Sequence, residues 1–254
     1  MNARKLLNTI LRPMGYEMAR TRDNPKYPGD FAAEDIEIIE KSRHYTMAKT
    51  VDKIFPIIDA VRYATQHRVP GSIVECGVWR GGMMMAAART LLELGDRSRD
   101  LYLFDTYEGM VEPTEKDTDI RGKKAITRFQ EAERTETGGV DWCYASMEEV
   151  TANLQSTGYP KEKLHFIKGR VEDTLPAQAP EKIAILRLDT DWYSSSKHEM
   201  DHLFPRLTPG GVLILDDYGY WKGCREATDE YFAAHKVQMH LVRVDEACRV
   251  GVKL

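Results

Sequence analysis

Acidic residues stand at or near the ends of four short apolar runs in this 254-residue chain. Two of these runs end in pairs of aspartates: Asp189 and Asp191 follow one, and Asp216 and Asp217 follow another. Neighbouring parallel strands lie about 4.8 Å apart, so these carboxylates would crowd together and raise one another's pKa values. A divalent cation that prefers oxygen ligands would remove the conflict. We therefore predict a metal site here, against the alternative that one aspartate caps a helix and the others are solvated.

The other two acids, Glu75 and Asp105, indicate a cofactor. Glu75 precedes a turn containing Gly77 and Gly81, and glycines there let the backbone approach a ligand before the next helix begins. A dinucleotide fingerprint would need glycine where this chain has Trp79, which counts against a bound pyrophosphate. Asp105 could accept both hydroxyls of a ribose. The pattern favours an adenosine-containing cofactor without a diphosphate, although a tight turn and a helix cap would use the same residues.

The elements that must position these acids are short, nearly continuous apolar runs separated by helical segments. Such runs are typical of a parallel sheet with both faces covered, whose ligands bind at the carboxyl ends of the strands. Two further runs at the end of the chain predict an antiparallel hairpin. The expected parallel strands span residues 72–77, 101–105, 164–169, 183–189 and 211–216, and the expected hairpin spans 237–244 and 247–254.

Three other segments surround this pattern. Residues 33–66 predict two helices, broken near residues 42–46 and kinked at Pro56, and residues 1–30 predict a short helix followed by an extended arm. The charged segment 110–163 interrupts the alternation of strands and helices. A segment of this length beside the carboxyl edge of a sheet is usually a lid or binding element, and the alternative is a solvated surface excursion.

The composition excludes several classes of partner. A formal charge of −4 argues against a nucleic acid held by phosphate contacts, and no run reaches the roughly 18 apolar residues of a membrane span. The N-terminus is too polar for a signal peptide, so we expect a cytoplasmic protein. The cysteines are scattered and are expected to be free thiols in a reducing compartment: Cys76, Cys143, Cys224 and Cys248.

Several long motifs, in order, closely resemble the macrocin O-methyltransferase family, which includes mycinamicin, tylosin and novobiocin sugar methyltransferases. The resemblance covers roughly residues 35–225. The motifs are Tyr45-Thr-Met47, Pro70-Gly-Ser-Ile-Val-Glu-Cys-Gly-Val-Trp-Arg-Gly-Gly82, Phe104-Asp-Thr-Tyr-Glu-Gly-Met110, Leu186-Arg-Leu-Asp-Thr-Asp-Trp-Tyr193 and Pro209-Gly-Gly-Val-Leu-Ile-Leu-Asp-Asp-Tyr218.

The resemblance implies an α/β class I methyltransferase (Rossmann-like) fold with a seven-stranded, mostly parallel sheet, N-terminal helices and a lid-like insertion. Residues 1–66 would be the N-terminal arm and helices of the same domain, and residues 67–254 the methyltransferase domain with its insertion at 110–163. The family also implies S-adenosylmethionine, Mg²⁺, a sugar hydroxyl of a natural product as substrate, and a homodimer.

Site residues follow from the same motifs. Carried over by motif, three carboxylates would bind the metal and a fourth, Asp191, would be the general base. Residues of the first two motifs and Asp105 would line or cover the cofactor pocket. The implied metal ligands are Asp189, Asp216 and Asp217, and the implied cofactor residues are Glu75, Gly77, Gly81, Asp105, Thr46 and Met47.

We therefore expect an enzyme in which the metal lowers the pKa of a chelated sugar hydroxyl and Asp191 accepts its proton. Trp192 and Tyr193 would pack either on a sugar face or in the core. The alternatives are an O-methyltransferase of catechol-like diols, for which the same chelation would serve, and a non-catalytic adenosine-binding protein. A nicotinamide oxidoreductase lacks its central glycine, and a nucleotide triphosphatase lacks its phosphate loop.

Overall fold

A computed structural model of the protein describes residues 9, 11, 13, 27–48, 50–136 and 138–254. The chain divides into two compact units, residues 1–36 and 37–254, and the second unit contains the sheet and the site. The short helix and arm expected over residues 1–30 fall mostly outside the described residues. Within the part of the chain that is described, no helix is both long and apolar enough to cross a membrane.

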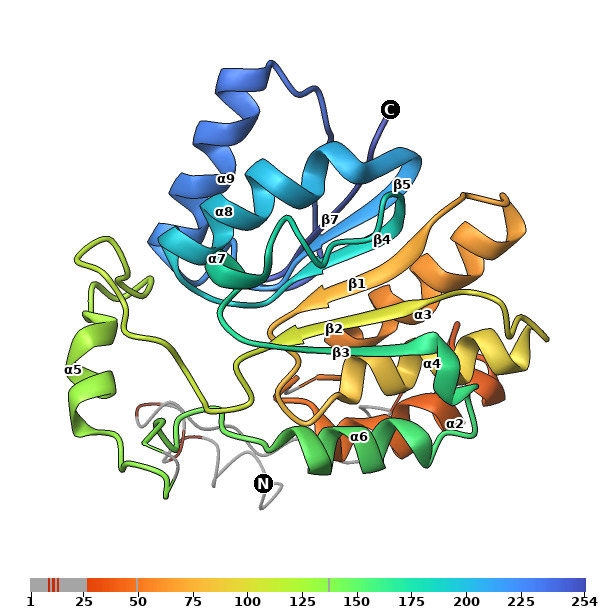
Figure 1. Ribbon diagram of the computed structural model, residues 1–254, viewed down its shortest axis with the longest axis horizontal. Helices are drawn as coiled ribbons and strands as arrows, with labels where there is room; N and C mark the ends of the chain where they lie inside the picture. Colours follow the sequence, from red (N-terminus) through yellow and green to blue (C-terminus); the bar gives the residue numbers. More distant parts are fainter. Residues whose placement is uncertain (1–8, 10, 12, 14–26, 49, 137) are drawn as a thin grey trace. The chain divides into compact units, whose positions relative to one another are not determined.

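A seven-stranded sheet in the order β3-β2-β1-β4-β5-β7-β6 forms the centre of the second unit (Figure 1). The first five strands of the chain run parallel, and β7 pairs antiparallel with both β5 and β6, so the expected mostly parallel sheet is confirmed. The strands are β1 (Ser72–Cys76), β2 (Leu101–Asp105), β3 (Leu164–Lys168), β4 (Ile183–Leu188), β5 (Leu207–Leu215), β6 (Val242–Arg243) and β7 (Arg249–Val252).

Three strands, β5, β6 and β7, differ from the sequence expectation by more than one residue. β5 begins four residues early, at Leu207, because the Pro-Gly-Gly segment that reads as a turn is accommodated by a register shift against β4. In the terminal hairpin β6 has only two residues, because only Val242 and Arg243 pair with β7, and β7 begins two residues late because the turn around Asp245 extends to Cys248. The Asp245 carboxylate accepts the backbone N–H groups of Ala247 and Cys248, which fixes this turn locally.

Helices cover both faces of the sheet (Figure 1). The expected break near residues 42–46 is present, since a 3₁₀ turn and an extended stretch separate α2 from α3. One face is covered by α3 (Val51–Gln66), α4 (Gly82–Glu93) and α6 (Met147–Gln155), and the other by α7 (Val171–Thr174), α8 (Tyr193–Leu203) and α9 (Lys222–His235). The remaining helical elements are α2 (Ala33–Ser42), η2 (Arg43–Tyr45), α5 (Ala125–Glu131), η3 (Lys161–Lys163) and η4 (Phe204–Arg206).

The segment expected as an insertion has two parts. Its C-terminal part contains α6, which packs on α4 and β3 as an ordinary crossover helix and buries Val150 and Leu154. Its N-terminal part, residues 110–146, departs from the alternation and carries α5. This part is joined to the start of α9 by a β-bridge between Asp119 and Trp221.

Candidate functional site

The carboxyl ends of four parallel strands lie level with one another and bring the predicted acids together. Cys76 of β1 pairs in register with Phe104 of β2 and with Leu188 of β4, and Leu188 pairs with Leu215 of β5. The residues that follow these positions therefore emerge at one edge of the sheet. Carboxylate oxygens of Asp189, Asp191 and Asp217 lie within 4.8 Å of one another there.

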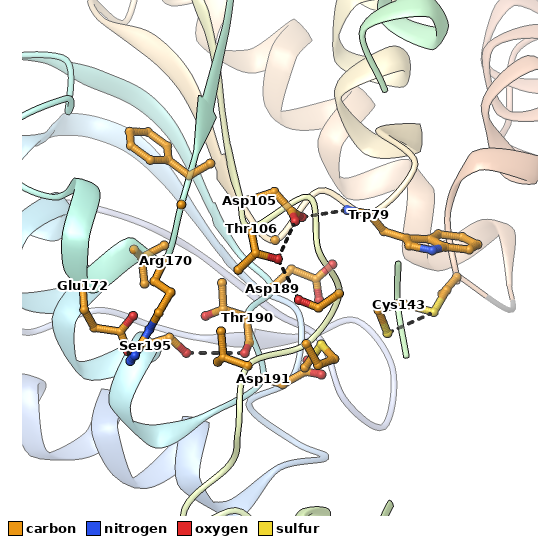
Figure 2. Close-up of a pocket in the computed structure, with 18 residues that line it drawn as sticks. Trp79, Asp105, Thr106, Cys143, Arg170, Glu172, Asp189, Thr190, Asp191 and Ser195 are labelled. Carbon is orange, nitrogen blue, oxygen red and sulfur yellow. Dashed lines mark hydrogen bonds and ion pairs between the residues drawn. The ribbon is translucent and has the colours of Figure 1, made fainter. Parts of the chain in front are cut away.

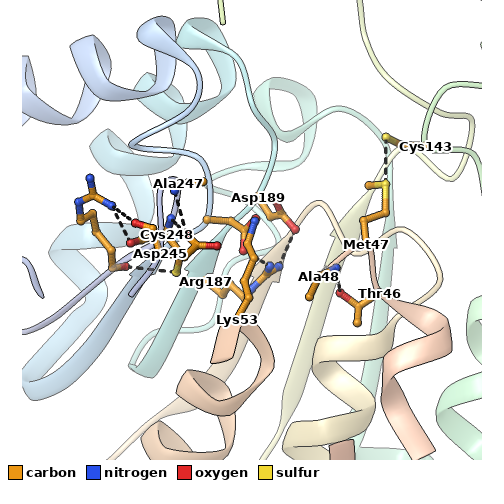
Figure 3. Close-up of polar contacts among 12 residues, drawn as sticks. Thr46, Met47, Ala48, Lys53, Cys143, Arg187, Asp189, Asp245, Ala247 and Cys248 are labelled. Carbon is orange, nitrogen blue, oxygen red and sulfur yellow. Dashed lines mark hydrogen bonds and ion pairs between the residues drawn. The ribbon is translucent and has the colours of Figure 1, made fainter. Parts of the chain in front are cut away.

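A buried arginine that sequence reasoning missed lies among these acids. Arg187 is directly opposite Glu75 in the β1–β4 register, and its side chain is only 4% exposed. Its guanidinium donates to Glu75 Oε1 at 2.5 Å and to Asp216. It also donates to Asp189 Oδ2 at 2.7 Å (Figure 3). An arginine in an otherwise apolar buried strand needs carboxylate partners, and this was the signal available in the sequence.

A second missed cation, Lys53 of α3, reaches the same edge. Its Nζ lies 2.5 Å from Asp216 Oδ2. Asp216 is therefore paired with two cations, and these hold its pKa below the usual range against the opposing effect of burial. Asp216 is thus the most strongly charge-compensated of the predicted metal ligands, while Asp189, Asp191 and Asp217 form the closest carboxylate group.

The carboxyls of Asp191 and Asp217 hold protons more tightly than usual. Burial raises the pKa of Asp191 to about 7; the hydrogen bond with Asp217 opposes this rise and the nearby Asp189 charge adds to it. Burial and the neighbouring Asp191 also raise the pKa of Asp217. One buried oxygen of Asp217, Oδ2, has no hydrogen-bond partner among the described residues. This edge of the site therefore has unmet capacity to bind a proton or a cation.

Two pockets meet at these aspartates. The first lies over the ends of β1, β2 and β3 (Figure 2), and the second lies beside α3 and the start of α9. Asp189 and Asp191 line both pockets, so a group bound in the first can face a group bound in the second across these two carboxylates. The other shared residues are Met47, Trp79 and Cys143.

The glycines of the β1–α4 turn have separate roles. A Cβ at Gly77, whose φ is +79°, would lie 2.1 Å from the backbone oxygen of Asp189, so glycine allows the turns after β1 and β4 to touch. Gly77 also lines the first pocket. Gly81 instead faces α6, where a Cβ would meet the Leu154 side chain at 2.6 Å. Trp79, at the position where a dinucleotide fingerprint has glycine, adopts φ +46° and lines both pockets.

Asp105 lines the first pocket but already accepts several hydrogen bonds. Its Oδ2 accepts the backbone N–H groups of Val78 at 2.7 Å and Trp79 at 3.1 Å, and its Oδ1 accepts that of Tyr107 at 2.8 Å. The carboxylate thus joins the β1–α4 turn to the turn after β2. Both oxygens expected to accept the ribose hydroxyls therefore already accept backbone N–H groups, three in all.

The remaining predicted cofactor residues lie on the side of the second pocket. Glu75 lines that pocket, and burial raises its pKa to about 8 although Arg187 opposes the rise. Thr46 also lines the second pocket, whereas Met47 lines both. The Cys143 thiol contacts the Met47 sulfur at 3.9 Å, which joins the Tyr45–Met47 segment to the insertion (Figure 3).

Aromatic residues form one wall of the second pocket, but they are not those considered from the sequence. Trp192 is fully buried and packs edge-on against Trp142 and Trp221, with ring centroids 5.5 and 4.9 Å away. Trp192 is therefore a core residue. The aromatic residues that line the second pocket are Trp79, Trp142, Tyr220 and Trp221.

Comparison with known proteins places the chain among methyltransferase sequences. The chain is 32% identical over 185 residues to the mycinamicin III 3''-O-methyltransferase of Micromonospora griseorubida, covering 73% of this chain and 69% of the relative. It is 33% identical over 177 residues to the 8-demethyl-8-(2,3-dimethoxy-alpha-L-rhamnosyl)-tetracenomycin-C 4'-O-methyltransferase of Streptomyces olivaceus. That match covers 70% of this chain and 64% of the relative, a little under two thirds of its length.

Solved structures share the fold. The O-methyltransferase NovP superposes with a TM-score of 0.69 at 24% identity, covering 98% of this chain and 97% of that one. The SAH-bound Podospora anserina methyltransferase PaMTH1 superposes with a TM-score of 0.53 at 14% identity, covering 97% and 95%. The architecture is therefore the class I S-adenosylmethionine-dependent methyltransferase fold. The model of the macrocin-O-methyltransferase (TylF) family matches residues 41–251, and the chain belongs to that family.

Proposed function

We propose that this protein transfers a methyl group from S-adenosylmethionine to a sugar hydroxyl of a glycosylated natural product, in a reaction that requires Mg²⁺. The observation that carries the proposal is the pair of pockets that share Asp189 and Asp191. A methyl donor and an acceptor hydroxyl must meet within about 3–3.5 Å, and two pockets joined at carboxylates provide such a meeting point. One relative is named for 4'-O-methylation of a rhamnosyl tetracenomycin and another for 3''-O-methylation of mycinamicin III, which supports the substrate class.

The first pocket is the proposed cofactor site. Gly77 and Asp105 line it, as expected for the turn and the ribose acid, and Met47 lies at its junction with the second pocket. Glu75, Gly81 and Thr46 stay predictions as cofactor residues. Two of them would act on the cofactor site indirectly: Glu75 contacts Arg187, and Gly81 packs against α6.

The carboxylates at the junction fit a divalent cation. Hard cations such as Mg²⁺ take carboxylate oxygens as ligands, and three such oxygens lie within 4.8 Å of one another. Within the part of the chain that the structure describes, Oδ2 of Asp217 has no hydrogen-bond partner, and this supports the same conclusion because a buried carboxylate oxygen without a donor is costly. We propose Asp189, Asp216 and Asp217 as ligands. Asp216 would have to share or exchange its contact with Lys53.

When bound, Mg²⁺ would lower the pKa of a chelated hydroxyl and orient it toward the methyl donor. Asp191 is proposed to accept the hydroxyl proton, because its carboxyl lies beside Asp217 and lines both pockets. Arg187 and Lys53 hold Asp189 and Asp216 in place and reduce the repulsion among the acids. The aromatic wall formed by Trp142 and its neighbours would shield a bound acceptor from water on that side.

The proposal is tested by incubating the protein with methyl-labelled S-adenosylmethionine and a panel of glycosides and catechols, with Mg²⁺ or with a chelator. Labelled glycoside formed only with Mg²⁺ is the expected result. If only catechols were labelled, the substrate would belong to the alternative class of catechol-like diols. Cofactor binding without any labelled product would favour a non-catalytic adenosine-binding protein.

The metal's part is tested separately with Asp189→Ala. This variant should bind Mn²⁺, used as a spectroscopic substitute for Mg²⁺, at least about tenfold more weakly. If the wild type kept its full activity in chelator, the metal would have no part in the reaction.

A further inference from the structure

Asp191 lies at the centre of a strained turn. The Trp192 N–H donates to the Thr190 carbonyl oxygen at 2.8 Å, and Asp191 between them has φ +70°. This is a γ-turn with positive φ at its central residue, a form that is rare and strained. Aspartate tolerates positive φ better than most residues, yet such a conformation persists only where the surroundings enforce it.

The residues after the turn are held by the insertion, far away in the sequence. The Trp192 indole N–H donates to the Val111 carbonyl at 3.0 Å. The Tyr193 backbone N–H donates to Asp117 Oδ1 at 2.7 Å. Tyr193 begins α8, and Trp192, at the N-cap position, provides no side-chain cap. Asp117 therefore takes the place of a capping residue for α8, where a carboxylate is also favoured by the helix dipole.

Asp117 is fully buried and its other oxygen is also occupied. Its Oδ2 accepts the Thr114 backbone N–H at 2.6 Å and the Thr114 hydroxyl at 2.8 Å. The carboxylate therefore connects one loop of the insertion to the first residue of α8. A buried carboxylate with these three hydrogen bonds has one well-determined position.

The start of α9 packs against the Asp117–Tyr193 hydrogen bond. A Cβ at Gly223 would lie 2.1 Å from Asp117 Oδ1 and 3.0 Å from the Tyr193 backbone nitrogen. Gly223 does not have positive φ, so alanine there would be strained only by this clash. Gly223→Ala is thus a way to disturb the Asp117–Tyr193 hydrogen bond from a different element.

We infer that Asp117 is a positioning residue, and that its hydrogen bond to the Tyr193 N–H holds the Thr190–Trp192 turn in the form that aims Asp191 at the junction of the two pockets. The inference rests on the proposed function, in which Asp191 accepts the proton. It assigns the insertion a role in arranging the reacting groups, in addition to covering the site.

The first test needs no acceptor. Amide hydrogen exchange is measured in the wild type and in the variants Asp117→Ala and Gly223→Ala, which remove or displace the acceptor oxygen. The Tyr193 amide should exchange at least about tenfold faster in each variant, while amides of β1 and β4 keep their protection. Unchanged Tyr193 protection in the variants that fold would overturn the inference, whether or not methyl transfer is ever observed.

The second test is a double-mutant cycle on turnover with Asp191→Asn. Asp117→Ala should lower kcat by about 10- to 100-fold, with little change in KM for the cofactor, because a misplacement of about 1 Å can cost that much. In the Asp191→Asn background the same substitution should cost less than about twofold. Equal losses in both backgrounds would show a general structural effect and overturn the positioning role.

Lys116→Ala is the matched control. Lys116 contacts the same residue, with its ammonium 3.5 Å from the centre of the Tyr193 ring, but it is exposed and leaves the backbone N–H untouched. In Lys116→Ala, kcat and the exchange rate of the Tyr193 amide should stay within about twofold of the wild-type values. A loss in Lys116→Ala as large as that in Asp117→Ala would assign the effect to the Tyr193 side chain and contradict the inference.

Discussion

Arg187 is the residue on which the acidic edge of the sheet depends. It pairs with Glu75, Asp189 and Asp216, and it is almost completely buried. Replacing it with leucine would leave several buried carboxylates without their cation. We expect Arg187→Leu to lower the free energy of unfolding by about 3–5 kcal/mol, measured by urea denaturation.

The matched control for this prediction is an exposed ion pair. Lys124 and Glu115 have side chains that are 56% and 79% exposed. Lys124→Leu should change the free energy of unfolding by less than about 1 kcal/mol. If Arg187→Leu lowers the free energy of unfolding no more than Lys124→Leu does, the buried carboxylates do not depend on Arg187 to balance their charge.

Asp191 and Asp216 can be distinguished by metal binding. Asp191→Asn removes the proposed base and should leave Mn²⁺ affinity within about threefold of the wild type while most turnover is lost, whereas Asp216→Asn should weaken Mn²⁺ at least about tenfold. Calorimetric titration measures both affinities. The reverse order would make Asp191 the third ligand, as the close grouping of Asp189, Asp191 and Asp217 allows.

The raised carboxyl pKa values predict how stability depends on pH. The pKa of Asp191 is raised from 3.8 to about 7 and that of Glu75 from 4.5 to about 8, with burial as the first cause of both. The folded protein keeps protons that the unfolded chain releases, so this stabilisation is complete below about pH 4 and is lost as pH rises through 7 to 8.

We therefore expect the free energy of unfolding in chelator to fall between about pH 6 and pH 8, and to fall less in Asp191→Asn than in the wild type. Urea denaturation at the two pH values measures this. Identical pH dependence in the two proteins would mean that Asp191 titrates normally.

At the scale of single residues, the sequence allowed the acids to be found but not their partners. Glu75, Asp189 and Asp216 follow or end apolar runs, so strand register alone predicts that they meet. Arg187 could have been recognised as a buried charge in need of carboxylates. Lys53 could not have been recognised in this way, because the apolar pattern of α3 does not reveal which end of the helix faces the carboxyl edge of the sheet.

At the scale of elements, the Tyr45–Met47 segment is fastened to the β1–α4 turn beside the two pockets. A Cβ at Gly82 would lie 2.5 Å from the Tyr45 carbonyl group, and Arg80 donates to the His44 carbonyl oxygen at 3.3 Å. Arg80 also pairs with Glu149 of α6 at 2.5 Å. The position of the segment that carries Met47 is therefore set by its contact with Gly82 and by the hydrogen bond from Arg80.

Gly82→Ala should push this segment away from the pockets without damaging the sheet. We expect at least about tenfold weaker binding of S-adenosylmethionine by calorimetry, with a loss of stability of less than about 2 kcal/mol. Gly29→Ala is the control, since its Cβ would meet nothing within 4 Å. Unchanged cofactor affinity in Gly82→Ala would show that the segment takes no part in binding.

Strand and helix order followed from the apolar pattern, but two features did not. The start of β5 was hidden by its Pro-Gly-Gly segment, which reads as a turn unless the bulge against β4 is known. The insertion's division into a crossover helix, α6, and a segment fastened to α8 and α9 depends on contacts between residues far apart in sequence, such as Asp117 with Tyr193.

At the scale of the whole molecule, the class I methyltransferase fold brings the turns after β1, β2, β4 and β5 to one edge and places two connected pockets there. The sheet explains why acids from distant motifs meet. The insertion and the Tyr45–Met47 segment, which differ from the regular alternation, supply further parts of the pocket walls. These are the parts that would select an acceptor.

The most direct test is a crystal structure of the protein with S-adenosylhomocysteine and Mn²⁺, located by its anomalous signal. The expected result is the cofactor in the first pocket, Mn²⁺ bound by Asp189, Asp216 and Asp217, and the cofactor sulfur facing Asp191. Mn²⁺ located away from these aspartates, or the cofactor in the second pocket, would contradict the proposed arrangement of donor, metal and acceptor.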